Sequence, residues 1–351
     1  MNRYIIGIDI GGTSVKMGIF DRGRFPEFSA EASVLTRTEE GGRFILPDIA
    51  EALLELLRGQ GIGITQVDGI GVGVPGAVIS GEEKDTTLVN RCVNLGWGVK
   101  DAAAELAGLT GIPRVEVLND ANAAALGEAF CGAGKAAGTG RESLKGITTV
   151  LVTIGTGIGG GIVRSGRVIR GAFGSAGEIG HMKTAPQHPF LAELRAAGAD
   201  IEAFADFEYF ASATGVIRLA RAAAALPDGG KLAALFEPEI MDSGTAGSSG
   251  VKVGAKDIFD AAKAGDPCAL RLRGFYFDTF GVGLAAVAAV IDPDAFIIGG
   301  GVSGEGQYLL DGIREAYGKY VFHASKDTEF RLAVLGNKAG MIGSAAAVTA
   351  E

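Results

Sequence analysis

The first candidate for acid–base chemistry is a pair of adjacent polar residues, Asn119 and Asp120. The pair stands where a strand-like segment, VEVLN, gives way to an alanine-rich helical segment, DANAAALGEAF. Asn and Asp commonly cap a helix by accepting its first free N–H groups, which is one interpretation. Strand ends in open α/β sheets also face the ligand crevice, where a carboxylate could take the proton of a hydroxyl that attacks phosphorus. The residues themselves leave both interpretations open.

A second candidate site is the glycine-rich stretch GSAGEIGHMK, which contains Glu178 and His181. A single histidine is most often a packed or a surface residue. An acid and a histidine three residues apart, with glycines around them, fit a polar pocket better. Such a pocket suits sugar hydroxyls, which both donate and accept hydrogen bonds. The other two histidines, His188 and His323, have no comparable neighbours.

Three glycine clusters could bind phosphate: Gly11-Gly12-Thr13, Gly155-Thr156-Gly157 and Gly299-Gly300-Gly301. Glycines let backbone N–H groups point at an anion, although Gly-Gly is also a good tight turn between two strands. The second and third clusters match G-x-G-x-x-G. However, the second continues into another strand and the third lies near the C-terminus, so neither predicts a dinucleotide-binding domain. We therefore expect two phosphate-facing hairpins and a third glycine loop at a helix N-terminus.

Two charged residues flank the first glycine cluster. Asp9 precedes it at the end of a strand-like run. A carboxylate there is well placed to hold Mg²⁺, often through water, since Mg²⁺ prefers carboxylates together with phosphate oxygens. Lys16 follows the cluster, and its spacing fits equally well a lysine that neutralises phosphate charge and a lysine solvated at the surface.

The elements that must position these residues alternate along the chain. Strand-like segments are expected at 4–10, 15–21, 67–76, 115–119, 147–168 (two strands), 295–304 and 330–336. Helices are expected at 45–60, 100–111, 120–130, 206–226, 255–265, 267–290 and 307–320, with an alanine-rich helix at the C-terminus. The later, Gly/Ser-rich part of 231–254 predicts a surface excursion.

One pattern occurs twice: a strand, a Gly/Thr turn and a second strand, at 4–21 and again at 147–168. Two such copies about one domain length apart predict a duplicated α/β unit. The chain has 351 residues, which exceeds what one hydrophobic core usually covers. We therefore expect two α/β domains, each a mixed sheet with helices packed on it.

Composition and charge describe an acidic globular protein. The formal net charge is −9 and the sequence has no basic cluster, which argues against a nucleic-acid partner. Three scattered cysteines, without a CxxC pair, predict neither a disulfide framework nor a cysteine-based zinc site, and they fit a reducing compartment. The chain shows no signal-peptide pattern, and the apolar stretch 281–291 is too short to span a bilayer. We therefore expect a cytoplasmic protein with no membrane partner.

A series of motifs extends over nearly the whole chain: DIGGTSVKMG, GVGVPGAV, NLGW, VLNDANAAALGEA, TIGTGIGGGIV, GEIGHM, YFASATG and IIGGGVS. In kind and in order, the series resembles the ROK family (repressors, open reading frames and kinases), and within it the glucokinases. Such a series is far more specific than any single glycine loop.

The resemblance implies an actin-like (ribonuclease H-like) α/β fold of two duplicated domains around an interdomain cleft. The smaller domain would comprise 1–118 plus 336–351, and the larger one 119–335. The implied activity is an ATP-dependent hexose kinase, first of all a glucokinase that phosphorylates the sugar 6-hydroxyl. ATP and Mg²⁺ would be required, and a homodimer is expected.

The resemblance also implies roles for individual residues. Asp120 would be the general base. The sugar would bind Gly76, Asn94, Asn119, Asp120, Glu178, His181 and Glu208. ATP would bind Asp9, Gly11, Gly12, Thr13, Lys16, Gly155, Thr156 and Gly157, with Gly299, Gly300 and Gly301 near adenosine. Asp9 would also be the Mg²⁺ ligand.

One interval departs from the family pattern. Many members carry C-x-C-G-x-x-G-C between the GEIGH histidine and the YAS helix and bind a structural zinc there. The corresponding interval here, 181–215, contains no cysteine. We expect no structural zinc, because such a site needs four thiolate or imidazole ligands. His181 must then be held by packing or hydrogen bonds.

Other functions are compatible with the same motifs. A kinase for mannose, fructose, an N-acetylhexosamine, allose or another polyol would carry them, and polyphosphate or ADP could replace ATP as the donor. A non-catalytic sugar sensor would keep the cleft without turnover, although intact Asp9 and Asp120 count against it. A sugar-responsive repressor would place a DNA-binding helix-turn-helix before the core, and here the first glycine loop begins within about ten residues of Met1.

Overall fold

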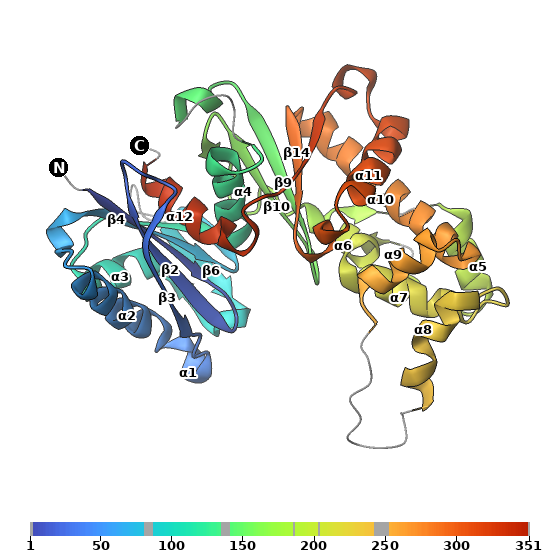
Figure 1. The fold of residues 1–351 in the computed structure, drawn as a ribbon, viewed down its shortest axis with the longest axis horizontal. Coiled ribbons are helices and arrows are strands. Elements are labelled where there is room, and N and C mark those ends of the chain that lie inside the picture. The colour runs from blue at the N-terminus through green and yellow to red at the C-terminus, as the bar shows by residue number, and fades with distance from the viewer. Residues whose placement is uncertain are drawn as a thin grey trace.

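The computed structural model describes residues 3–80, 87–134, 141–184, 187–202, 204–241 and 253–349. Two five-stranded sheets, each with its own helices, dominate the fold (Figure 1). The Gly/Ser-rich part of the surface excursion expected within 231–254 lies largely at 242–252, outside the described residues.

The first sheet has the strand order β3-β2-β1-β4-β8. Its central strand β1 pairs antiparallel with β2, whereas β4 and β8 follow in parallel. Its strands are β1 (Tyr4–Ile10), β2 (Ser14–Asp21), β3 (Phe28–Leu35), β4 (Val67–Val74) and β8 (Val115–Asn119).

The second sheet repeats this plan with the order β11-β10-β9-β14-β15. Its central strand β9 pairs antiparallel with β10 and parallel with β14, as β1 does with β2 and β4. Its strands are β9 (Thr148–Ile154), β10 (Ile158–Arg164), β11 (Arg167–Val168), β14 (Ala295–Gly299) and β15 (Glu329–Leu332). The duplicated α/β unit predicted from the two hairpins is therefore confirmed.

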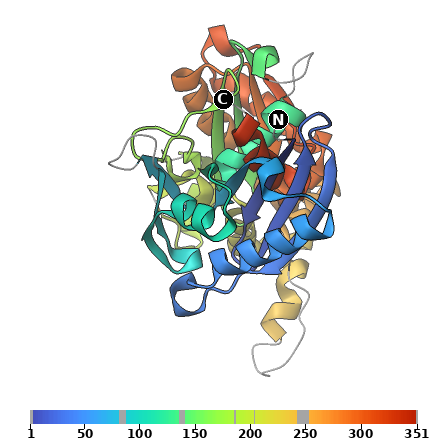
Figure 2. The same ribbon diagram turned by 90° about the vertical axis from the view of Figure 1, so that its left-hand side faces the viewer.

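Side chains of β1 alternate between two helical layers, as a period of two requires. Ile6, Ile8 and Ile10 belong to the core that contains α2 (Ile45–Gly59) and α3 (Ala102–Thr110). Ile5 faces the opposite layer, α12 (Ala339–Thr349), with which it shares a small core. Asp9 has the same parity as Ile5 and therefore lies on the α12 face. Figure 2 views the molecule from the side of this first sheet.

Helices α12 and α4 (Asp120–Cys131) pack closely between the two sheets (Figure 1). Glycines allow close approach of the backbones. A Cβ on Gly343 of α12 would overlap the carbonyl oxygen of Ala123 of α4, and a Cβ on Gly71 of β4 would overlap that of Ser344 of α12. Because α4 also packs against β9 and β10, it contacts both halves. The predicted domain boundary at residue 119 stays a prediction.

The remaining helices cover the second sheet and extend away from it. They are α5 (Pro189–Ala196), α6 (Phe207–Ala211), α7 (Ala213–Ala224), α8 (Gly230–Met241), α9 (Ala255–Lys263), α10 (Pro267–Ile291) and α11 (Gln307–Tyr320), beside the short α1 (Glu39–Gly42) near β3. Among the described helices, α10 alone is long and apolar enough to cross a membrane. However, 61% of its most apolar window is buried inside the protein, which is the pattern of a core helix.

Several strands were absent from the sequence-based expectation. They are β3, the ribbon of β12 (Lys183–Thr184) with β13 (Ala205–Asp206), and a three-stranded sheet of β5 (Ala77–Ser80), β6 (Thr87–Cys92) and β7 (Trp97–Lys100). The helix expected at 206–226 is divided at Ser212, whose extended backbone ends α6 and whose side chain caps α7.

Candidate active site

A cleft of about 890 Å³ lies between the two halves and collects most of the candidate residues. Its lining includes Asp9, Lys16, Gly76, Asn94, Asn119, Asp120, Gly155, Gly157, Glu178, His181, Glu208 and Gly300. Gly11, Gly12, Thr13, Thr156, Gly299 and Gly301 are not among the lining residues. The site residues were chosen from separate motifs, and the fold brings most of them to one cavity.

Strand register explains why the acidic residues meet. Asp9 of β1 lies opposite Gly73 of β4, and Val74 of β4 lies opposite Asn119 of β8. These parallel strands therefore end at one edge of the sheet, which is where ligands bind in open α/β sheets. In the second sheet, the ends of β9 and β14 likewise place Gly155 and Gly300 in the cleft.

Asn119 and Asp120 occupy the N-terminus of α4 in different ways. Asn119 is the N-cap: its Oδ1 accepts a hydrogen bond from the Asn122 N–H at 3.1 Å. Its Nδ2 donates to the Gly76 carbonyl oxygen at 3.1 Å, which ties the cap to the turn after β4. Capping is therefore real, but it uses Asn119 and leaves Asp120 at the cleft wall.

The carboxyl group of Asp120 is largely buried, and this burial raises its pKa. The Ala121 N–H, which donates to Oδ1 at 2.8 Å, opposes the rise because it stabilises the ionised form. A carboxylate with a raised pKa and a position at a helix N-terminus can be ionised and still accept a proton. These are the properties that a general base requires.

Asp9 and Lys16 face each other across the first hairpin, where the β1–β2 register pairs them directly. Burial raises the pKa of Asp9 to about 6, the negative charge of Asp120 adds to the rise, and Lys16 opposes it. The Asp9 carboxyl group also lies against the start of α12, because a Cβ on Gly340 would be only 2.8 Å from it. Lys16 is partly buried and lines the cleft.

The glycine clusters form tight turns. The Gly11 N–H donates to the Ser14 carbonyl at 3.0 Å, and the Gly155 N–H donates to that of Gly157 at 3.0 Å. The tight-turn interpretation therefore holds for both turns, and Gly155 and Gly157 of the second turn also line the cleft. In the third cluster, Gly300 has a φ of 84°, a conformation that favours glycine, and precedes a short 3₁₀ helix (Gly301–Glu305).

Glu178 and Glu208 lie on the second half of the cleft. Burial raises the pKa of Glu178, the positive charge of His181 opposes the rise, and Asp120 and Glu208 add to it. Glu208 accepts a hydrogen bond from the Ile158 N–H at 3.1 Å, which fixes it beside the second glycine turn. Both carboxylates line the cleft, where a bound hydroxylated ligand can reach them.

His181 ends a short 3₁₀ helix (Ile179–His181) and is exposed to the cleft. Its Nδ1 lies 3.4 Å from Oδ2 of Asp206, which belongs to β13. The sequence had not singled out Asp206, although it stands two residues before Glu208. Among the described residues, no cluster of three or more His, Cys, Asp or Glu side chains could hold a metal ion.

Other lining residues were missed because they come from distant parts of the chain. Gly336, Asn337, Ala339 and Gly340 reach the cleft only because α12 returns to the first sheet. The sequence carries no local signal for that return. Ser175 also lines the cleft and lies within the same stretch, GSAGEIGHMK, as Glu178, so it could have been found there.

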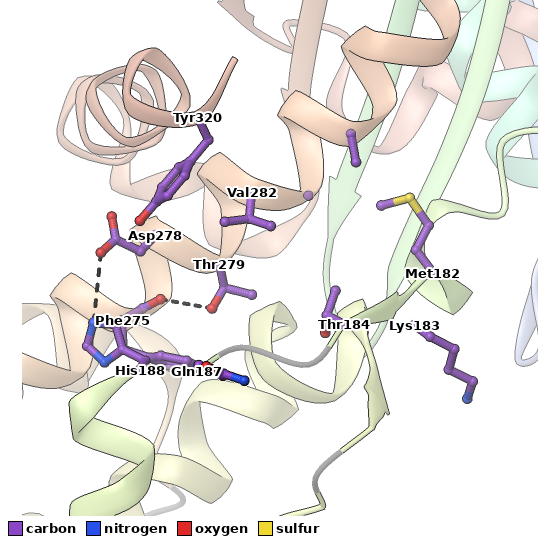
Figure 3. A pocket seen from close by; sticks show the side chains of 12 residues that line it. Met182, Lys183, Thr184, Gln187, His188, Phe275, Asp278, Thr279, Val282 and Tyr320 are labelled. Carbon is purple, nitrogen blue, oxygen red and sulfur yellow. Dashed lines mark hydrogen bonds and ion pairs between the residues drawn. The ribbon is translucent and has the colours of Figure 1, made fainter. Parts of the chain in front are cut away.

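A second cavity, of about 380 Å³, lies apart from the cleft between α10 and the segment that follows His181. Figure 3 shows His188 beside Phe275, with its ring directed at Asp278 and the Tyr320 hydroxyl close by. Burial lowers the pKa of His188, while Asp278 opposes this change. None of the expected site residues lines this cavity.

Comparison with known proteins identifies relatives over nearly the full chain. The ROK family model matches residues 5–351. The chain is 35% identical to a glucokinase of Halalkalibacterium halodurans over 97% of this chain and 94% of that protein.

Two solved structures are also similar. A ROK family glucokinase of Streptomyces griseus in complex with glucose and AMPPNP has 31% identity and a TM-score of 0.63, covering 97% of this chain and 98% of that one. A ROK hexokinase of Thermus thermophilus has 29% identity and a TM-score of 0.68, covering 98% and 97%. The chain therefore belongs to the ROK family.

Proposed function

We propose that this protein is an ATP-dependent hexose kinase that phosphorylates glucose at its 6-hydroxyl. The observation that carries the proposal is the shared cleft, in which Asp120, Asp9 and the Gly155 turn come together from both sheets. Glucokinase relatives at 35% and 31% identity support the same activity.

In this mechanism, Asp120 takes the proton of the sugar hydroxyl as the hydroxyl oxygen attacks the terminal phosphorus of ATP. The bond from that phosphorus to the bridging oxygen breaks, and ADP leaves with the electron pair. The burial that raises the Asp120 pKa strengthens the carboxylate as a base. Asn119 positions it, because the cap fixes the start of α4. Glu178, His181, Glu208, Asn94 and Gly76 surround the space for the sugar and supply donors and acceptors for its hydroxyls.

Asp9 fits a Mg²⁺ site. It is a half-buried carboxylate whose pKa is raised by burial and by Asp120, so a cation nearby would favour its ionised form. Mg²⁺ bound with ATP would neutralise phosphate charge and orient the terminal phosphoryl group. Lys16 and the backbone N–H groups of the three glycine clusters, Gly11 to Thr13, Gly155 to Gly157 and Gly299 to Gly301, would hold the remaining phosphate and adenosine groups.

We further propose a smaller domain of 1–118 plus 336–351 and a larger one of 119–335 that close on the substrates. Closure would exclude water, so that phosphate is transferred to the sugar and not hydrolysed. A homodimer and a cytoplasmic location belong to the same proposal, as does the lack of a structural zinc.

The test is ADP release from Mg·ATP with a panel of glucose, mannose, fructose, allose, inositol and N-acetylhexosamines. We expect glucose to be preferred, and Asp120→Asn to lower kcat by at least about 100-fold. Asp101→Asn is the matched control: Asp101 caps α3 by accepting from the Ala104 N–H at 2.8 Å and does not line the cleft. It should stay within about two-fold of wild type.

Activity of folded Asp120→Asn within a few-fold of wild type would remove Asp120 from the role of base. Preference for another sugar would correct the substrate. Silence across the whole panel, from folded protein that binds ATP, would refute the kinase and favour a sugar sensor.

A further inference from the structure

The segment after His181 is fixed by a two-stranded ribbon, β12 with β13. In this ribbon Lys183 pairs directly with Asp206, and the Phe207 N–H donates to the Met182 carbonyl at 2.8 Å. The ribbon thus joins the loop that carries His181 to the start of α6, which carries Glu208. It occupies the interval in which many ROK relatives would have their cysteines.

The Asp206 carboxylate divides its two oxygens between two partners. Oδ2 lies 3.4 Å from Nδ1 of His181, and Oδ1 accepts a hydrogen bond from Nζ of Lys183. The bond from Lys183 is the largest of the influences that lower the pKa of Asp206, and His181 acts in the same direction. The lowered pKa favours the ionised form of Asp206, which can accept a hydrogen bond from a protonated Nδ1 of His181.

No other hydrogen bond to the His181 ring is found among the described residues, and the His181 side chain is 65% exposed. Packing therefore does little to fix its orientation. Figure 3 shows Lys183 extending away from the second cavity, so that it is free to contact Asp206. Ion pairs this exposed add little stability, so the arrangement is better explained by orientation than by stability.

We propose that Asp206 is a positioning residue that fixes the His181 ring for sugar binding, with Lys183 holding the Asp206 carboxylate in place. By accepting a hydrogen bond from Nδ1–H, Asp206 keeps the ring proton on Nδ1 and leaves Nε2 as an acceptor for a sugar hydroxyl. This inference rests on the proposed function, because it takes His181 to be a sugar ligand. Asp206 itself does not line the cleft.

The informative variant is Asp206→Asn, which keeps the shape but can present an N–H to Nδ1. The ring proton would then move to Nε2, and the sugar hydroxyl would lose its acceptor. We expect the glucose KM to rise about 10- to 100-fold, the range found when a partner that orients a metal-binding histidine is removed. The KM for ATP should not change, and Asp206→Glu should recover most of the loss.

The tautomer can be read directly, because the protein has three histidines. Ring ¹⁵N shifts of His181 at alkaline pH should show the proton on Nδ1 in wild type and on Nε2 in Asp206→Asn. The matched control is Asp278→Asn, since Oδ2 of Asp278 lies 3.8 Å from Nε2 of His188, outside the cleft. It should leave both the His181 signals and the glucose KM unchanged.

Unchanged His181 signals in folded Asp206→Asn would overturn the proposal, whatever the kinetics. A shifted tautomer with a glucose KM within two-fold of wild type would overturn the role in sugar binding. A wild-type protein without sugar kinase activity would refute the proposed function and this role together. The ring signals would still decide separately whether Asp206 sets the His181 proton.

Discussion

Replacing Asp9 by asparagine should stabilise the nucleotide-free protein and abolish its catalysis. Burial, together with the charge of Asp120, raises the pKa of Asp9 from 3.8 to about 6 despite Lys16. Between these two values the folded protein binds more protons than the unfolded chain. The free energy of unfolding therefore falls as the pH rises through this window.

The magnitude follows from the size of the shift. At about 1.36 kcal/mol per pKa unit, the change from 3.8 to about 6 corresponds to about 3 kcal/mol of stability lost at neutral pH. The loss is nearly complete above about pH 6, roughly half as large at about pH 5, and small below about pH 4. Asparagine has a similar shape and no charge, so Asp9→Asn should regain up to this amount.

Urea unfolding without nucleotide or Mg²⁺ measures the effect at about pH 7.5 and about pH 5. The stability gained by Asp9→Asn should fall to roughly half at the lower pH. In an Asp120→Asn background the gain should be smaller, because the neighbouring charge is already gone. A variant no more stable than wild type at the higher pH, or a difference that does not depend on pH, would refute the reasoning. Kinase activity should be lost at either pH.

Two further predictions concern contacts made by helix α4. Glu128 is fully buried and accepts hydrogen bonds from the N–H groups of Ala133, Val334 and Leu335. Glu128→Gln should therefore lower the free energy of unfolding, measured in urea, by about 2–4 kcal/mol. A loss below about 0.5 kcal/mol would contradict this. Gly343→Ala should cost more than about 3 kcal/mol, because its Cβ would overlap the Ala123 carbonyl in the α4–α12 contact. Gly318→Ala on α11 is the control. Nothing lies within 4 Å of the Cβ that alanine would add, so this substitution should be neutral or slightly stabilising. Equal effects of the two substitutions on stability would refute the packing argument.

The sequence was sufficient to predict the repeated architecture. Alternation and turn residues act locally, so β1, β2, β8, α4 and the second hairpin were found close to their observed limits. The ribbon β12–β13 has two residues in each strand, too few for a period of two to be recognised. The β5–β6–β7 sheet escaped notice for a similar reason: two of its strands have four residues each.

The site was predictable where one short motif carries both the reactive residue and its support. Asn119 and Asp120 illustrate this, because the N-cap residue and the carboxylate at the cleft wall are neighbours in sequence. Asn337 and Gly340 were missed, since their place in the cleft depends on α12 crossing back to β1. Asp206 was missed because its partner His181 is 25 residues away and only the ribbon brings the two together.

The charges of the cleft connect its stability to its chemistry. Four of its lining residues are carboxylates, Asp9, Asp120, Glu178 and Glu208, while Lys16 is the only lysine or arginine among the described residues that line it. This imbalance, added to burial, raises the pKa of Asp9 and of Glu178.

A fold selected for stability alone would replace such groups by neutral ones. Their presence is explained if the cleft must accept a cation and a hydroxyl proton, because both relieve the repulsion among these carboxylates. Binding of Mg·ATP should therefore stabilise wild type more than Asp9→Asn, and thermal unfolding of both with and without Mg·ATP would measure the difference. Equal stabilisation of the two proteins would show that Asp9 does not contribute to holding the metal.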